Sequence, residues 1–508
     1  MSDASVHAAV LTTRAVTSPN HDTTKIDKSV ICFQVQVPSQ KPEPDQISQL
    51  TRVIQSRQMT VLPDPPSQNQ GLSDDPRLPD ASQWLRDFII AVDGRKKHVP
   101  LDPVVQHLRD LVESTPNLRM WASAMFDEIP NKIPYNKSSV GRSRVRGYKH
   151  MFELFSVIVT GVAPTWGMAE RGVSLVGLPF QAILDWPMGT PSGHAFFLSE
   201  GVNQRFRAML EAWRDGVLKT TKSQYVITAE DGGWLCEEAL AAIEKDANLD
   251  SRRWYAFRDL FKCDPEGDPA HWGFKSWDDF FVRQFRDIDT LRPVAYPDHP
   301  EWVVNTCESR PIMVKSSVKD YDRFWLKGRN YSVAEMLNHH AFKDEFVGGT
   351  VYQALLAQTS YHRWASPVSG DVVYAEIVHG TYFSERPTNG LFSSPVGPPE
   401  YNQVYLSHVA TRAIIYIRAP EPVGLMCVVA IGIADVSTCE VASKFSAGWP
   451  RRVSKGEEIG MFHYGGSSLC LLFRKGVRLA WVEGAIPGNS DQNLPVRSAL
   501  AVAYAADQ

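Results

Sequence analysis

Hydrophobic positions follow two different periods along the chain, and these divide it into a helical part and a β-rich part. Between residues 81 and 250 apolar residues recur three and four positions apart, the spacing of amphipathic helices. From about Val303 the period falls toward two between Gly and Pro turns, which is typical of strands. Helical examples are ASQWLRDFIIAVDG, PVVQHLRDLVES and NQRFRAMLEAWRDGVLK, and strand examples are GDVVYAEIV, AIIYIRA, GLMCVVAIGIADV and RLAWVEG. We therefore expect an α+β fold, with a helical N-terminal domain at 81–250 and a β-rich domain at 301–508.

Two further segments flank the helical part. Residues 1–80 are rich in Ser, Pro, Gln and Asp and have too little periodic apolar content to form a core, so we expect them to be mostly disordered. Residues 251–300 are predicted to form a connecting helical section. Within it, Ser276 is suited to cap a short helix, with Asp278 and Asp279 in the first turn, where the helix dipole favours carboxylates.

Composition excludes several classes of function. The formal charge of −4 gives no general basic field for nucleic acid. Seven cysteines without Cys-x-x-Cys spacing argue against a zinc site and against a disulfide framework, so no metal is expected. The first residues lack a secretory signal, and the longest apolar run, Val423 to Ala434, is too short to span a bilayer. We expect a cytoplasmic protein without a membrane anchor.

A small-residue stretch near the end of the chain, Gly465-Gly466-Ser467-Ser468, comes directly before the apolar run Leu469–Phe473. On composition alone it is an ordinary hairpin turn. However, two glycines also permit a strained backbone, and a hydroxyl placed directly after them can fold back on the preceding carbonyl. That is the geometry of a self-cleaving peptide bond, and the four residues alone leave both interpretations open.

The flanking segments resemble the phosphatidylserine decarboxylase family, and most closely its soluble fungal branch, the tryptophan decarboxylases. Four segments carry the resemblance in order: GFKSWDDFFVRQFRDIDTLRP, LKGRNYSVAEMLNH, YHRWASPVSGDVVYAEIVHGTYFSE and VSKGEEIGMFHYGGSSLCLLFRKG. The helical stretch QYVITAEDGGWLCEEAL is similar to the N-terminal domain of that branch. The resemblance implies that the β-rich part is a catalytic domain of the pyruvoyl-decarboxylase type.

The same resemblance implies that the Gly466–Ser467 bond is cut by its own serine. The hydroxyl attacks the preceding carbonyl to give an ester, β-elimination leaves dehydroalanine, and loss of ammonia yields a pyruvoyl group from Ser467. The two fragments, 1–466 and 467–508, are expected to stay associated. A pyruvoyl carbonyl forms an imine with a substrate amine and withdraws electrons from the carbon that loses CO2.

The resemblance also implies site residues. His362, in the segment YHRW, matches the family histidine of decarboxylation. For the acidic partner, this chain has Glu308-Ser309 in NTCESRP where most family members have an Asp-Gly pair, and a glutamate can still orient a histidine. The family motif has a second histidine where this chain has Ala365, and alanine cannot accept a proton. Three outcomes are consistent with this difference. His362 serves both steps, His463 or His379 substitutes, or the chain does not mature and is an inactive relative.

The expected substrate is a small amino acid. A phosphatidylserine enzyme must reach a bilayer through an anchor or an amphipathic helix, and this sequence offers no anchor. An aromatic amino acid such as L-tryptophan is implied by the resemblance alone. Phosphatidylserine decarboxylation in phospholipid synthesis is the alternative, and a homo-oligomer is left open.

Overall fold

The structure is a computed structural model, and part of the chain is described in it. The segment expected to be disordered, residues 1–80, lies outside the described residues, as does Gly466 of the expected cleavage site. The described residues are 83–95, 99–130, 135, 143–166, 178–249, 253–322, 331–385, 400–436, 438–463 and 467–505.

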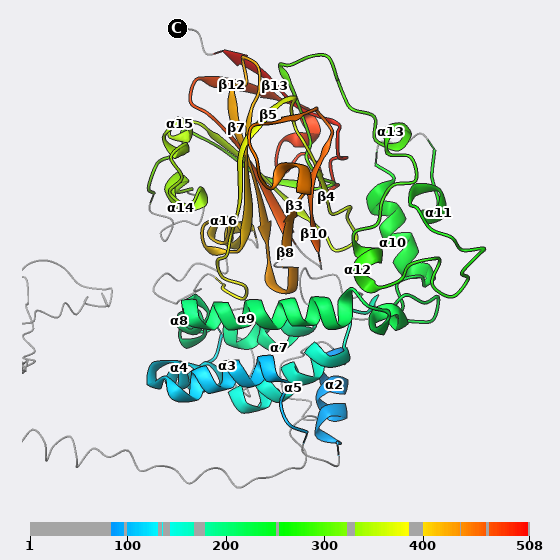
Figure 1. Ribbon diagram of the computed structural model, residues 1–508, viewed down its shortest axis with the longest axis vertical. Helices are drawn as coiled ribbons and strands as arrows, with labels where there is room; N and C mark the ends of the chain where they lie inside the picture. Colours follow the sequence, from blue (N-terminus) through cyan, green and yellow to red (C-terminus); the bar gives the residue numbers. More distant parts are fainter. Residues whose placement is uncertain are drawn as a thin grey trace, which may run out of the picture. The chain divides into compact units, whose positions relative to one another are not determined.

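The segments with helical spacing form helices that pack against one another (Figure 1). In α3, Asp102 caps the first turn by accepting a hydrogen bond from the Val104 N–H at 3.0 Å. Val105, Leu108 and Val112 recur along its buried face. The helices are α2 (Gln83–Asp93), α3 (Pro103–Ser114), α4 (Pro116–Asp127), α5 (Tyr148–Gly161), α7 (Pro179–Met188), α8 (Pro191–Leu198), α9 (Glu200–Trp213), η2 (Arg214–Leu218), η3 (Thr221–Val226) and α10 (Glu237–Ala247).

Three short helices follow in the connecting section: α11 (Phe257–Leu260), α12 (Trp277–Phe281) and α13 (Ile288–Leu291). The predicted cap of α12 is confirmed, because the Ser276 side chain accepts a hydrogen bond from the Asp279 N–H at 3.2 Å. Asp278 and Asp279 both lie in the first turn. Asp278 is buried and its carboxylate takes part in the site described below.

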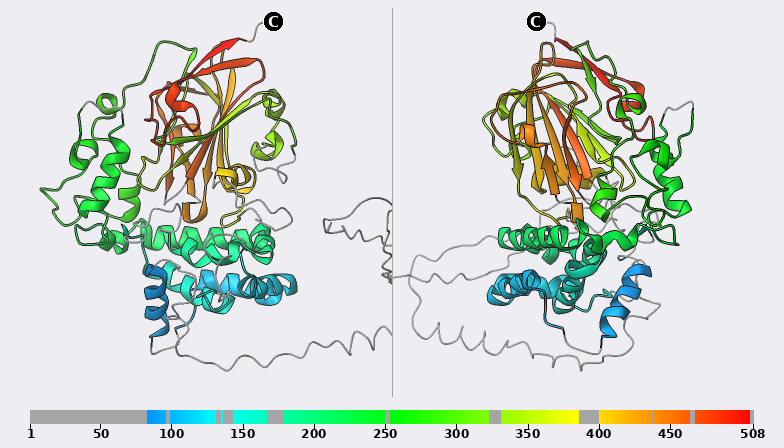
Figure 2. Two further views of the ribbon diagram at one scale, coloured as in Figure 1. Left: turned by 180° about the vertical axis from the view of Figure 1, so that it is seen from behind. Right: turned by 45° about the vertical axis from the view of Figure 1, so that its right-hand side comes forward.

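The remaining described residues are rich in strands, which confirms the α+β class (Figures 1 and 2). The strands are β1 (Trp302–Val304), β2 (Arg310–Ser316), β3 (Thr350–Leu356), β4 (Arg363–Ala365), β5 (Gly370–Val378), β6 (Arg412–Arg418), β7 (Leu425–Gly432), β8 (Thr438–Val441), β9 (Arg451–Val453), β10 (Glu458–His463), β11 (Ser467–Phe473), β12 (Val477–Trp481) and β13 (Ala499–Ala505). Between them lie α14 (Val333–Met336), α15 (Lys343–Phe346), α16 (Glu400–Val409), η4 (Ala434–Val436), η5 (Ser443–Phe445) and η6 (Glu483–Ala485).

Within the described residues these strands form three sheets, and neighbouring strands in each sheet run antiparallel. The order is β2-β3-β11-β7-β6-β5-β9 in the large sheet, β4-β10-β8 in a small one and β1-β13-β12 in another. All seven residues of β11 are buried. Because β11 is paired on both edges and covered on both faces, the residues after its two serines, Leu469–Phe473, form a continuous apolar run rather than an alternating one. Its first residue, Ser467, lies opposite Leu356 of β3 and Gly432 of β7.

The large sheet continues into the sheet β4-β10-β8 at the start of β11. β3 leads to β4, β7 leads to β8, and β10 leads to β11, so the two sheets keep the same strand order. The small sheet pairs Met461 with Arg363 and His463 with Thr438. The ends of β3 and β7 that lead to β4 and β8 therefore both lie at Ser467, the first residue of β11.

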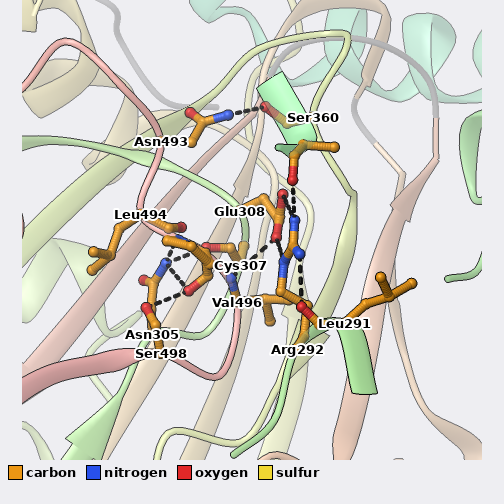
Figure 3. A network of polar contacts seen from close by, with 12 residues as sticks. Leu291, Arg292, Asn305, Cys307, Glu308, Ser360, Asn493, Leu494, Val496 and Ser498 are labelled. Carbon is orange, nitrogen blue, oxygen red and sulfur yellow. Dashed lines mark hydrogen bonds and ion pairs between the residues drawn. The ribbon is translucent and has the colours of Figure 1, made fainter. Parts of the chain in front are cut away.

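The C-terminal segment, residues 494–505, is hydrogen-bonded to the residues around Asn305. The Asn305 side chain donates to the Leu494 carbonyl at 2.7 Å, and the Leu494 N–H donates to the Ser309 carbonyl at 2.8 Å (Figure 3). β13 also pairs with β1. The residues after Ser467 thus supply strands to two sheets and a loop that is hydrogen-bonded to residues 305–309.

The central position of β11 predicts a large loss of stability when one of its buried side chains is shortened. Leu471→Ala, in the buried centre of β11, should lower the free energy of unfolding by about 2–5 kcal/mol, because it leaves a cavity in a covered strand. Leu479→Ala on β12, where the side chain is half-buried, is the control and should cost clearly less. Denaturant unfolding of the full chain measures both, and equal losses would contradict the central role of β11.

Candidate active site

The two serines of the Gly-Gly-Ser-Ser stretch have different surroundings. Both are buried, and successive residues of a strand face opposite sides of the sheet. Ser468 Oγ accepts a hydrogen bond from Gln353 Nε2 at 3.2 Å, and Gln353 Oε1 accepts one from the Tyr331 hydroxyl at 2.7 Å. Ser467 Oγ has no hydrogen-bond partner among the described residues. Of the two hydroxyls, Ser467 is therefore the one that these residues leave unengaged.

His362 lies at the end of the connection from β3 to β4 and is buried. Its carbonyl accepts a hydrogen bond from the Phe462 N–H at 3.0 Å, which holds it beside β10. The Phe281 ring of α12 stacks on the imidazole, with centroids 3.9 Å apart and planes 27° apart. His362 is thus held at the same end of β10 that leads to Ser467, and the stacking restrains its ring orientation.

His463, the last residue of β10, is buried between two carboxylates. Its Nδ1 lies 2.8 Å from Asp278 Oδ1 of α12, and its Nε2 lies 3.0 Å from Glu440 Oε2 of β8. Burial disfavours the imidazolium, but the hydrogen bonds to Asp278 and Glu440 outweigh it and raise the pKa of His463. The hydrogen bond from His463 lowers the pKa of Glu440.

This arrangement bears on the possibility that His463 replaces the missing base. Each ring nitrogen faces a carboxylate oxygen, so the doubly protonated ring satisfies both contacts. A ring that already holds both protons cannot accept one from a serine. The geometry favours a role for His463 in fixing α12, β8 and β10 to one another, immediately before residues 464–466.

Glu308 is buried and bonds to an arginine (Figure 3). Arg292 donates to it through Nε and, at 3.2 Å, through Nη2, and the Val496 N–H donates to Oε1 at 3.4 Å. Arg292 Nη2 also donates to the Ala247 carbonyl at 2.6 Å. The carboxylate that the resemblance pairs with a histidine is therefore neutralised here by a guanidinium.

Ala365 is hydrogen-bonded to the segment that carries Glu308. Its N–H donates to the Thr306 carbonyl at 2.8 Å, two residues before Glu308. Ala365 is the third residue after His362, which corresponds to about 10 Å along a strand at about 3.3 Å per residue. The structure therefore brings His362 and His463 into contact with α12, through Phe281 and Asp278, whereas Ala365 bonds to the segment that carries Glu308.

The third candidate histidine, His379, follows β5 at an exposed position. Burial, and to a lesser extent the charge of Arg207 on α9, lower the pKa of His379, whereas Glu211 of α9 opposes this shift. Within the described residues, no group of three or more His, Cys, Asp or Glu side chains is suited to hold a metal ion.

Comparison with known proteins identifies the family. Two family models described as phosphatidylserine decarboxylase match residues 102–243 and 277–487. The chain is 38% identical over 323 residues to the decarboxylase iboD of Amanita muscaria, which covers 61% of this chain and 88% of that relative. The chain belongs to the phosphatidylserine decarboxylase family.

Other relatives lie in the branch expected from the sequence. An L-tryptophan decarboxylase of Psilocybe cubensis is 32% identical over 75% of this chain and 82% of its own length. Another, of Psilocybe cyanescens, is 36% identical over 59% of this chain and 68% of its own length. The chain is therefore a decarboxylase, that is, a carboxy-lyase. In the part of the decarboxylase that the structure describes, no helix has the length and apolar character needed to cross a membrane.

Sequence reasoning missed several residues of the site. Asp278 was predicted only as a first-turn carboxylate, Arg292 had no assigned role, and Phe281 was one of many aromatic residues. The contact between Asp278 and His463 joins positions 185 residues apart, so no local spacing could reveal it. The cap at Ser276 was the one available signal, because it fixes which residues begin α12.

Breaking the buried Arg292–Glu308 pair should be costly. Glu308→Ala leaves the guanidinium buried without its carboxylate, so we expect a loss of about 3–5 kcal/mol in the free energy of unfolding. The double variant Arg292→Met/Glu308→Leu removes both charges and should lose less than Glu308→Ala alone. Asp289→Asn, which breaks the exposed pair with Arg497, is the control at about 0.2–1 kcal/mol. A double variant with a lower free energy of unfolding than Glu308→Ala would contradict this account of the pair.

The carboxylates around His463 predict a pH-dependent stability. Because the folded-state pKa of His463 lies above its ordinary value of 6.5, its contribution is complete below that value and is lost as pH rises through the folded pKa. The contribution of Glu440, whose pKa is lowered, is lost as pH falls through that lower folded pKa. The stability lost in His463→Gln should thus be largest between these two pKa values and should shrink at alkaline pH.

Melting temperatures across this pH range, in the Ser467→Ala background, measure that difference. The exposed His339, whose Nε2 lies 3.7 Å from Glu335, provides the control variant His339→Gln, which should change little at any pH. A stability loss in His463→Gln that stays constant from acid to alkaline pH would show that the charge of the ring is not involved.

Proposed function

We propose that the chain is a pyruvoyl-dependent decarboxylase of a small amino acid, with an aromatic substrate such as L-tryptophan, and that it matures by self-cleavage at Gly466–Ser467. The observation that carries the proposal is the buried Ser467 hydroxyl, which has no hydrogen-bond partner among the described residues. It belongs to the residue directly after Gly466, at the start of a strand held on both edges. An unengaged hydroxyl at this point fits a residue that becomes the cofactor.

The proposed cleavage uses atoms of the chain and one water molecule. Ser467 Oγ bonds to the Gly466 carbonyl carbon, the C–N bond breaks, and the hydroxyl proton passes to the nitrogen. Elimination then removes the Cα proton of residue 467 and breaks its Cβ–Oγ bond, which releases the carboxylate of residue 466 and leaves dehydroalanine. Water replaces the nitrogen of the dehydroalanine, which releases ammonia and leaves the pyruvoyl group. That group supplies an electron-withdrawing carbonyl for the loss of CO2.

We propose His362 as the residue that transfers protons at this site. It lies beside β10 on the approach to Ser467, where Phe281 restrains its ring. His463 is less suited, because two carboxylates favour its protonated form. His379 is less suited because it is exposed beyond the end of β5. A missing general base typically costs about 10²–10⁴ in rate, which a single maturation event tolerates better than repeated turnover does.

The substrate assignment and the domain assignment are also proposals. Two relatives named as L-tryptophan decarboxylases support an aromatic amino acid, and phosphatidylserine is the alternative that the family models suggest. We propose a helical domain at 81–250, a connecting section at 251–300 and a catalytic domain at 301–508. The pairing of β11 with β3 and β7 supports continued association of the two fragments after cleavage.

Intact-mass analysis tests maturation. The purified chain should yield a fragment that begins at residue 467 with a pyruvoyl-blocked terminus, Ser467→Ala should stay whole, and Ser468→Ala should still be cut. CO2 release from tryptophan, tyrosine, phenylalanine and phosphatidylserine, measured side by side on the cleaved protein, should be largest for tryptophan. A chain that stays whole after long incubation would contradict the proposal and favour an inactive relative.

A further inference from the structure

The connection from β7 to β8 runs beside the proposed cleavage site. Gly432, at the end of β7, pairs with Ser467, and Thr438, at the start of β8, pairs with His463. The chain directly after Gly432 therefore leaves the large sheet beside Ser467. A displacement of this segment would change the surroundings of Ser467.

The middle of that connection is anchored to the helical part of the chain by a buried carboxylate. Asp435 Oδ2 accepts a hydrogen bond from the Phe180 N–H at 3.0 Å, and Oδ1 accepts one from the Gln181 N–H at 3.1 Å. These are two of the first N–H groups of α7, which have no partner within the helix. Asp435 is 0% exposed, so water does not compete for these contacts. A carboxylate from residue 435 thus completes the N-terminus of a helix 254 to 255 positions earlier.

Two further contacts hold the same connection. The Ala434 N–H donates to the Tyr382 carbonyl at 3.1 Å, and the Tyr382 N–H donates to Asn203 Oδ1 of α9 at 3.1 Å. Ala434 has a φ of 56°, a left-handed conformation that is uncommon for alanine and that its surroundings must maintain. The helical part therefore reaches this connection through α7 directly and through α9 by way of Tyr382.

We propose that Asp435 is a positioning residue for self-cleavage: by capping α7 it fixes the chain directly after Gly432, the residue that pairs with Ser467. This inference rests on the proposed maturation of the chain. It assigns the helical N-terminal part a role in shaping the cleavage site of the β-rich part. Burial raises the pKa of Asp435 to about 8, while the two N–H donors and the helix dipole favour its ionised form.

The rate of self-cleavage in Asp435 variants tests this role. Asp435→Ala removes both contacts to α7 and should slow appearance of the 467–508 fragment by about 10²-fold, the cost of a displacement of about 1 Å at a reacting centre. Asp435→Asn keeps one acceptor oxygen and should slow it by a smaller factor. If residue 435 only filled space, Asp435→Asn, which has nearly the same volume, would be cleaved at the wild-type rate.

Asp102→Ala is the matched control. Asp102 also caps a helix of the same part, α3, through the Val104 N–H at 3.0 Å, but within the described part of the chain it has no hydrogen bond to residues 433–436. The control should weaken the helical part and leave the cleavage rate within about twofold. Wild-type cleavage rates in folded Asp435→Ala, or equal slowing by Asp102→Ala, would overturn the proposal.

Hydrogen exchange in the uncleavable Ser467→Ala chain separates this inference from the proposed function. Adding Asp435→Asn should speed exchange at the Gly432 and Ala434 amides, which donate to Thr411 and Tyr382, and leave β2 unchanged. This readout does not need self-cleavage. Unchanged exchange at both amides would refute the anchoring role, whereas an uncut wild-type chain with faster exchange would refute maturation alone.

Discussion

The structure depends on the pairing of β11 between β3 and β7 in the middle of a buried sheet. Every residue of this strand is buried, and its register sets Ser467 opposite Leu356 and Gly432. Since side chains alternate between faces, a slip of one residue would exchange the surroundings of Ser467 and Ser468. The polar contact between Ser468 and Gln353, inside an otherwise apolar region, favours the observed register. The identity of the unengaged hydroxyl is therefore a consequence of strand pairing.

The polar contacts around β4 differ from those that the family resemblance implies. Where the family resemblance implies a histidine next to the acidic residue, this chain has Ala365, and Glu308 bonds to Arg292. A carboxylate that accepts hydrogen bonds from a guanidinium is engaged by that partner and is not available to orient an imidazole. The charge of Glu308 is balanced by Arg292, sixteen residues earlier in the chain. Glu308 also accepts a hydrogen bond from the Val496 N–H, which joins it to the C-terminal segment.

Local periodicity predicted most of the fold, and the site was predicted in part. Helical spacing identified α3 and α9, alternation and apolar runs identified β5, β6 and β7, and the cap at Ser276 marked the start of α12. These signals are local, because they depend on which face of one element is buried. The contacts of His463 with Asp278 and of Asp435 with α7 join residues 185 and 255 positions apart. They arise from how separate elements meet, which no single stretch of sequence specifies.

The central place of β11 has a consequence for the proposed maturation. A cut before Ser467 would turn one chain into two, and the shorter one would supply the inner strand β11 together with β12 and β13. Folding of the uncut chain is unimolecular, whereas reassembly of the cut pair requires a bimolecular encounter and refolding of an apolar strand exposed to water. The mature protein would then persist because its unfolding is slow, and, once lost, its fold would be restored only by new synthesis.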